Sequence, residues 1–359
     1  MLKTYQIYLI NLFLKRVFFI SLIFLGLIFI LSIFEEISFF KDIEIGFYLP
    51  LLLTALSSPT ALFEIFPFIF LISSQFFFIT LIEKNELEIL KVNGLNNIKI
   101  IKILFYISLF LGILIITIFY TFSSKLKFIY LDLKNNYSND DKYLAVVTEN
   151  GLWIKDEIDD KIYIISSSKI NNNYLEGLII NQFDINFNLI EVTMASRADI
   201  RNFSWIIENP TTTRDNVKKS IEGSLILKTH FNKEKINSLF SNLSSLNILG
   251  LIKLGNDYKS LGYSDKTVQL QLHKIIAYPF YLTLMTLFAA VIMINLKSNK
   301  PIVFHIILGI FLSVLIYYFY YLFNLLGETE KIPLLASVWL PLLIMGLFIL
   351  ISLVRINEK

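Results

Sequence analysis

The chain has 359 residues, of which 55% are hydrophobic, 15% aromatic and 17% charged, and its formal net charge is +3 at pH 7. Soluble globular proteins carry about 25% charged residues, so this composition indicates a membrane protein, and the small net charge excludes nucleic acid as a partner. The absence of cysteine excludes disulfides and thiolate metal sites.

The apolar residues form two blocks around a polar middle. We therefore expect an α-helical membrane protein with transmembrane helices 1–3 in residues 1–122, an inserted domain in 123–268 and transmembrane helices 4–6 in 269–359. Each expected span is long enough to cross about 30 Å of hydrocarbon. The spans are 17–34, 61–82, 98–122, 273–296, 301–326 and 333–354. Residues 48–58, broken by Pro50 and Pro59, are expected to lie shallowly at the membrane surface.

The polar middle has the pattern of an all-β, jellyroll-like domain, because short strand-like segments alternate with turn residues. A hairpin turn is expected at 184–188, and a helical segment at 233–260 leads back to the membrane. The expected strands are 144–148, 152–155, 161–166, 177–183, 189–197, 204–208 and 224–230.

Lysine and arginine in the short loops predict the orientation. One set of loops and ends carries many basic residues, whereas the other carries Lys41 and Lys331. Both termini and the loop between spans two and three are therefore expected in the cytoplasm. The β domain is then outside it, in the periplasm of a bacterium with two membranes.

That cytoplasmic loop contains a short helix-like segment, residues 85–94. Asn85 is expected to cap it together with Glu88 at the third helical position, and Gly94 to end it. Leu87 and Leu90 share one face and are expected to fill an apolar groove of a partner. No other expected cytoplasmic segment is large enough to receive force or a signal.

The sequence contains none of the motifs sought for catalysis. It lacks the phosphate-binding G-x-x-x-x-G-K-[ST] and the G-x-S-x-G nucleophile motif, so we expect no catalytic residue, cofactor or metal, and no ATP hydrolysis by this chain. His230, His273 and His305 lie far apart. The interpretation as a membrane-anchored scaffold or binding protein, whose spans only anchor it, stays open.

Few polar side chains lie within the spans. Phe34, Lys41 and Glu64 are the candidates for substrate contact, although the favoured interpretation of Glu64 is a carboxylate at the membrane surface. Gln75 is expected to hydrogen-bond a neighbouring helix, and His305 to pack.

Several motifs together resemble one family. Residues 85–95 read N-E-L-E-I-L-K-V-N-G-L, similar to a family pattern S-E-L-x-x-x-R-A-x-G-[VI], with Glu86, Leu87 and Gly94 matching and Lys91 in place of arginine. Segments 56–59, 64–67, 194–198 with Trp205, 271–279 and 336–341 resemble further family motifs in the same order. The chain resembles the lipopolysaccharide export permeases LptF and LptG, and its carboxy-terminal half is more similar to LptG.

The resemblance implies a half-transporter in the bacterial inner membrane that extracts lipopolysaccharide and passes it to a periplasmic bridge toward the outer membrane. It implies an LptB-like ATPase dimer, a second LptF-like permease subunit and LptC- and LptA-like bridge proteins. The implied coupling residues are Glu86, Leu87, Glu88, Leu90, Lys91 and Gly94. Residues 177–197 are expected to continue the lipid path. Near the outer end of span one the chain has Glu35 and Glu36 where some members have basic residues. A permease for another lipid or a lipoprotein stays open as an alternative, although the lipoprotein-release and macrolide exporters have four spans.

Overall fold

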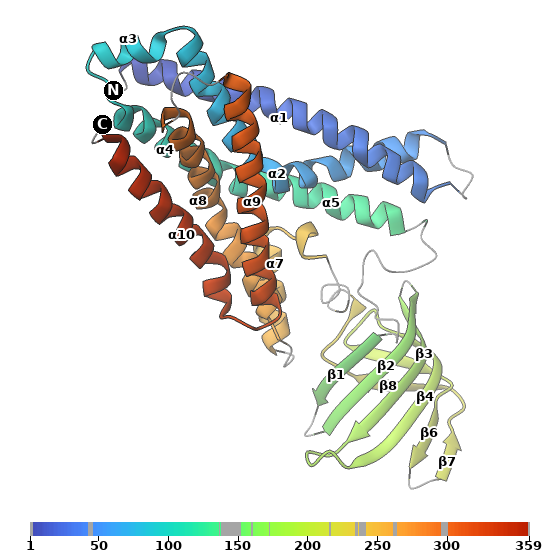
Figure 1. Ribbon diagram of the computed structural model, residues 1–359. Coiled ribbons are helices and arrows are strands. Elements are labelled where there is room, and N and C mark those ends of the chain that lie inside the picture. Colours follow the sequence, from blue (N-terminus) through green and yellow to red (C-terminus); the bar gives the residue numbers. More distant parts are fainter. Residues whose placement is uncertain are drawn as a thin grey trace. The chain divides into compact units, whose positions relative to one another are not determined.

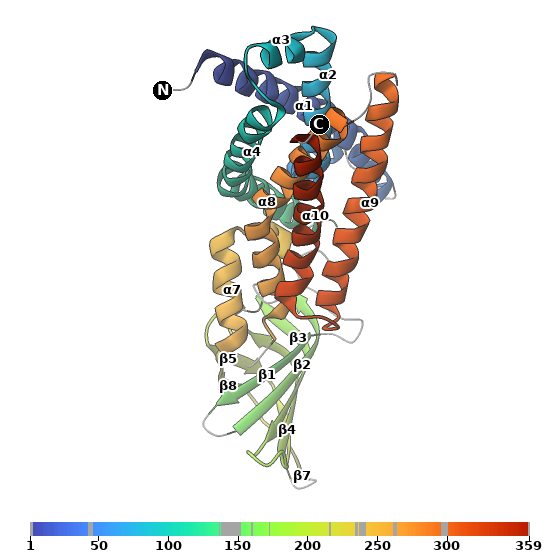
Figure 2. The same cartoon turned by 60° about the vertical axis from the view of Figure 1, so that its left-hand side comes forward.

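The computed structural model describes residues 3–41, 46–135, 137, 152–158, 161–171, 173–214, 217–233, 236, 242–260, 264–295 and 301–357. The chain divides into two compact units. Met1–Tyr130 and Lys266–Lys359 form the helical unit, and Leu131–Asp265 form the β unit. Figures 1 and 2 show the elements of both units.

Among the described residues, six helical stretches are long and apolar enough to cross a membrane, which confirms the expected six spans. The third of them contains a π-helical turn, η1 (Ile115–Phe119), between two α-helices. The helices are α1 (Thr4–Phe39), α2 (Tyr48–Glu83), α4 (Asn97–Leu114) with α5 (Tyr120–Asn135), α8 (Lys266–Asn295), α9 (Ile302–Glu328) and α10 (Leu334–Asn357).

The expected surface segment at 48–58 is wrong, because it forms the first turns of α2. Pro50 lies in the first turn, where the helix needs no N–H donor. Pro59 and Pro67 lie inside the helix. Hydroxyls bond to the backbone carbonyls of this part of the helix, with Thr54 Oγ1 2.8 Å from the Pro50 oxygen and Ser58 Oγ 2.6 Å from the Thr54 oxygen.

The helices α2 and α8 form the centre of the helical unit, since 78% of the most apolar stretch of each is buried, against 17% for α1 and 11% for α9. The prediction that Gln75 hydrogen-bonds a neighbouring helix is confirmed: its Nε2 lies 2.8 Å from the carbonyl oxygen of His305 in α9. His305 is itself buried, with Nδ1 3.1 Å from the Pro301 carbonyl oxygen, as expected of a packing residue.

The β unit contains one antiparallel sheet in the order β1-β2-β3-β4-β5-β8, with β6 paired to β4 and β7. Its strands are β1 (Leu152–Ile158), β2 (Lys161–Asn171), β3 (Tyr174–Phe183), β4 (Leu189–Asp199), β5 (Ser204–Glu208), β6 (Thr211–Arg214), β7 (Val217–Ser220) and β8 (Ser224–Lys228). An all-β insertion between two sets of three spans confirms the expected fold class. The expected strand at 144–148 lies outside the described residues.

Strands β6 and β7 were not expected, because both are short and polar. They continue β5 and β8: β5 pairs with the end of β4, and β6 pairs with its middle. Asn209, with a φ of 47°, and Pro210 separate β5 from β6. The pair β5 and β6 is thus one strand interrupted by a two-residue break.

The core of the β unit lies on one face of the sheet and centres on Trp205, which is fully buried. Its indole nitrogen donates to the Phe231 carbonyl oxygen at 2.8 Å. The expected hairpin turn is confirmed, since the backbone N–H of Asn188 donates to the Asp184 carboxylate at 2.7 Å. In the expected helical segment, α7 (Ile248–Ser260) and a 3₁₀ turn at Leu243–Ser245 are present, and residues 237–241 lie outside the described part.

Candidate functional site

The helix α3 (Glu86–Val92) connects the second and third spans. Lys84 and Asn85 alone separate it from α2, and four residues separate it from α4. Both views place it at the same end of the helical unit as the start of α1 and the end of α10 (Figures 1 and 2). The shortness of both links ties any displacement of α3 to the ends of α2 and α4.

The expected capping box at the start of α3 is wrong. Asn85 has a left-handed backbone, with a φ of 56°, and its side chain makes no cap hydrogen bond. The two-residue turn from α2 imposes this conformation, whereas a capping asparagine normally has an extended backbone. Glu86 is held instead by Tyr8 of α1, whose hydroxyl lies 2.5 Å from the carboxylate, with Lys84 Nζ at 4.0 Å.

The end of α3 is built as expected. Gly94 has a φ of 82°, its N–H donates to the Lys91 carbonyl at 2.9 Å, and the Leu95 N–H donates to the Leu90 carbonyl at 3.0 Å. This pair of bonds is the Schellman motif. Lys99 Nζ also reaches the Gly94 carbonyl at 2.9 Å, which ties the end of α3 to the first turn of α4.

The two faces of α3 differ from the expected arrangement. Leu87 and Leu90 share a face, but they pack against the core of the chain's own helical unit. Both side chains are only half-buried, and that their exposed part fills a partner's groove stays a prediction. The apolar residues of the opposite face are Ile89, 58% exposed, and Val92, 88% exposed. They are flanked by the exposed side chains of Glu88 and Lys91.

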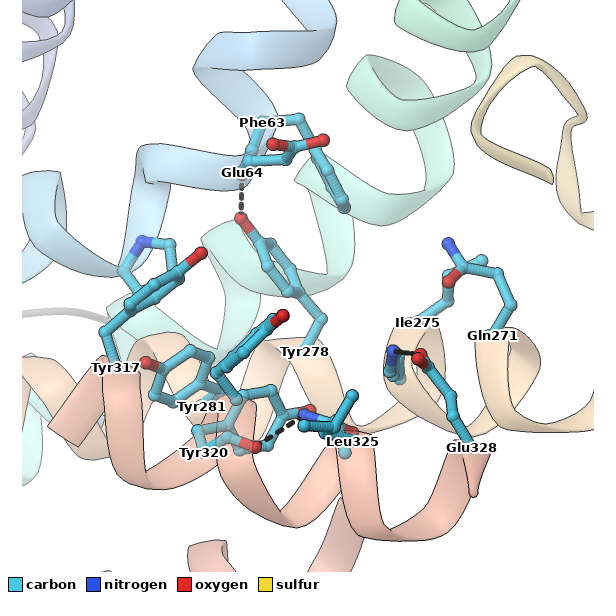
Figure 3. Close-up of a pocket in the computed structure, with 14 residues that line it drawn as sticks. Phe63, Glu64, Gln271, Ile275, Tyr278, Tyr281, Tyr317, Tyr320, Leu325 and Glu328 are labelled. Carbon is cyan, nitrogen blue, oxygen red and sulfur yellow. Dashed lines mark hydrogen bonds and ion pairs between the residues drawn. The ribbon is translucent and has the colours of Figure 1, made fainter. Parts of the chain in front are cut away.

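Tyrosine side chains line a cavity of about 280 Å³ between α2, α8 and α9 (Figure 3). The sequence did not predict this cavity. Its signal was the spacing in α9, where positions 317, 320, 321, 324 and 328 recur at three or four residues and so lie on one face. The tyrosines of this cavity, which we name the tyrosine cavity, are Tyr278, Tyr281, Tyr317, Tyr320 and Tyr321.

A proline explains one contact at the edge of the tyrosine cavity. Pro67 has no N–H for the carbonyl of Phe63, four residues earlier, and the hydroxyl of Tyr278 in α8 donates to that carbonyl. The Phe63 and Tyr278 rings are stacked with centroids 4.4 Å apart. The kink-prone part of α2 is therefore fixed to α8.

The three candidate substrate residues are not brought together in this cavity. Glu64 contributes to its lining, whereas Phe34 and Lys41 do not. Phe34 is 66% exposed, and Lys41 is exposed just after α1. The other charged side chains of the lining are Lys274 and Glu328, which form an ion pair at 3.0 Å between α8 and α9.

In the β unit, Arg201 binds Asp199 with two nitrogens, Nη2 at 2.6 Å and Nε at 3.0 Å from Oδ2. These hydrogen bonds lower the pKa of the Asp199 carboxyl below its ordinary 3.8. The pair fixes the turn between β4 and β5. Among the described residues, no group of three or more metal-ligating side chains lies together.

Six apolar helices long enough to span a membrane, with an inserted antiparallel β unit, define a multi-pass membrane protein. The family model for the lipopolysaccharide export system permease LptF/LptG matches residues 7–355. The chain belongs to this family and is an inner-membrane permease component of lipopolysaccharide export. The matched family contains both LptF and LptG and does not separate them. No curated protein sequence matches the chain.

Proposed function

We propose that this chain is the half of a transporter that extracts lipopolysaccharide from the inner membrane and passes it to a periplasmic bridge. A separate cytoplasmic ATPase dimer, LptB-like, powers the extraction by docking on α3. A second, LptF-like permease subunit completes the transmembrane part, and LptC- and LptA-like proteins form the bridge. By its motifs this chain takes the LptG role.

The observation that carries the proposal is the outward face of α3. Ile89 and Val92 expose apolar surface beside Glu88 and Lys91, and a contiguous apolar group rimmed by charge is typical of a docking surface. Leu87 and Leu90 hold α3 against its own helices, so force applied to the outer face moves the whole helix. The links to α2 and α4 then pass the movement to two spans.

The proposal also implies an orientation of the chain in the membrane. The end of the helical unit with α3 faces the cytoplasm together with both termini, as the basic loops predict, and the β unit is periplasmic. Phe34, Lys41 and Glu64 contact the lipid on the way out. The strands β3 and β4, in the middle of the sheet, continue the lipid path, so photo-crosslinkers at Leu178 and Ile180 on the core face should capture lipopolysaccharide.

Glu86 provides the test of coupling. We expect it to pair with a basic residue of the ATPase, so Glu86→Arg should uncouple ATP hydrolysis from lipid release while the protein stays inserted. Tyr8→Phe is the matched control, because it removes the 2.5 Å intramolecular bond and keeps the carboxylate. Lipid release at the wild-type rate by Glu86→Arg would refute the proposed role of α3.

A further inference from the structure

We propose that the tyrosine cavity is a binding site for a primary ammonium group, carried by the head group of a membrane lipid. The cavity lies far from α3. Glu64 precedes the end of α2 by nineteen residues, which is about 28 Å at 1.5 Å per residue and close to the thickness of the hydrocarbon layer. The cavity is therefore at the membrane surface opposite α3, at the level of lipid head groups.

The charges of the cavity select a cation. Glu328 is already paired with Lys274 at 3.0 Å, which leaves Glu64 as the carboxylate whose charge the lining does not neutralise. Lys127 of α5 attracts this carboxylate electrostatically from outside the lining. Glu64 is exposed, so a ligand can reach it. A group with positive charge and hydrogen-bond donors complements this end of the cavity.

Two buried polar side chains of the lining lack partners among the described residues. Asn324 is 5% exposed, and its Nδ2 donates to the Tyr320 carbonyl at 2.8 Å, while its Oδ1 has no partner. Tyr281 is 4% exposed, and its hydroxyl has none either. Buried polar groups of folded proteins are normally hydrogen-bonded. Oδ1 of Asn324 can only accept a hydrogen bond, so a ligand that pairs with it must donate one.

The aromatic walls fit the same ligand. Tyr281 and Tyr320 are stacked with centroids 4.8 Å apart, and Tyr317 and Tyr321 lie nearly parallel at 6.5 Å. The faces of such rings attract cations. A volume of about 280 Å³ is at the lower end of small-molecule sites, so it admits a head group while acyl chains stay in the membrane. Figure 3 shows Glu64 and Glu328 at different ends of the cavity.

That the ligand carries a primary ammonium group is inferred from these residues alone. That this group belongs to a membrane lipid rests on the proposed transport function. The test uses the full chain in detergent without ATP or a partner, so its outcome is separate from that of the α3 docking proposal. Native mass spectrometry measures retention of phosphatidylethanolamine, phosphatidylglycerol and phosphatidylcholine of the same chain length. Ethanolamine chloride is added as a competitor.

We expect the wild type to retain phosphatidylethanolamine in preference to both other lipids. Glu64→Gln should weaken this retention about tenfold or more, because the acceptor of the ammonium group loses its negative charge. Asn324→Leu removes the unpartnered acceptor and keeps a side chain of similar size, so it should weaken the retention as well. This variant replaces Glu64→Gln as the test if Glu64→Gln does not fold. Glu83→Gln, at the other end of α2, is the control and should bind as the wild type does.

Ethanolamine chloride at millimolar concentration should compete weakly if the source is a lipid. Displacement of the lipid by micromolar ethanolamine would support an ammonium site whose ligand is a free amine. Equal retention of phosphatidylglycerol or phosphatidylcholine, or full preference in both folded cavity variants, would overturn the proposal.

Discussion

At Gly112 the backbone of α4 approaches the backbone of α8 closely. A Cβ atom there would lie 2.7 Å from Cα and 2.9 Å from Cβ of Pro279 in α8, whereas carbon atoms in contact prefer about 3.5–4.0 Å. Gly112→Ala must therefore push the helices apart by about 1 Å. Overpacking of this kind costs about 1–3 kcal/mol, and the better helix propensity of alanine returns about 1 kcal/mol.

Gly26 of α1 supplies the matched control, because a Cβ atom there meets nothing within 4 Å. Gly26→Ala should leave stability unchanged or raise it by up to about 1 kcal/mol. The two variants should then differ by about 1–3 kcal/mol, measured as thermal unfolding in one detergent. Equal melting temperatures for Gly112→Ala and Gly26→Ala would refute the close packing of α4 on α8, by which a movement of α3 reaches the centre of the helical unit.

Three further predictions concern single contacts. Gly94→Ala forces a side chain into the left-handed region at a cost of about 1–2 kcal/mol, so hydrogen exchange of the amides of residue 94 and Leu95 should speed up. Unchanged protection of these amides would count against the Schellman motif at the end of α3. Trp205→Phe leaves the buried Phe231 carbonyl without its donor, and denaturation of the β unit should become easier by about 1–3 kcal/mol; a wild-type midpoint would contradict this. The pKa of Asp199 is lowered by Arg201, so its contribution to stability is present above about pH 4 and lost as the pH falls through the lowered value. Arg201→Gln should therefore be less stable than the wild type at pH 7 and approach it at low pH, and a difference independent of pH would exclude this role.

The sequence predicted the elements that depend on one chain segment. Long apolar runs fixed the number of spans, and alternating segments with turn residues located most strands, as at 204–208. The glycine stop of α3 was predictable because only a left-handed residue fits there. The pattern could not show that α2 continues through Pro59, because a proline by itself indicates the end or a kink of a helix.

Features that depend on neighbours were predicted poorly. The spacing of Leu87 and Leu90 gave their common face, but whether that face turns to the chain's own core or to a partner is decided by tertiary packing. Glu86 binds Tyr8, a residue 78 positions away, and the sequence did not predict this contact. The tyrosine cavity joins three helices, and composition alone does not separate such a lining from residues that face lipid.

The most direct test of the central claim is co-purification of a cytoplasmic ATPase with this chain from its native membrane. Val92 is 88% exposed, so Val92→Asp removes apolar docking surface with little effect on folding. Thr4→Asp places the same charge at the start of α1, also exposed, as the control. We expect the wild type and Thr4→Asp to retain the ATPase and Val92→Asp to lose it. Loss of a buried valine contact should lower the affinity for the ATPase about tenfold or more. Equal retention by Val92→Asp, or no ATPase with the wild type, would contradict the docking role of α3.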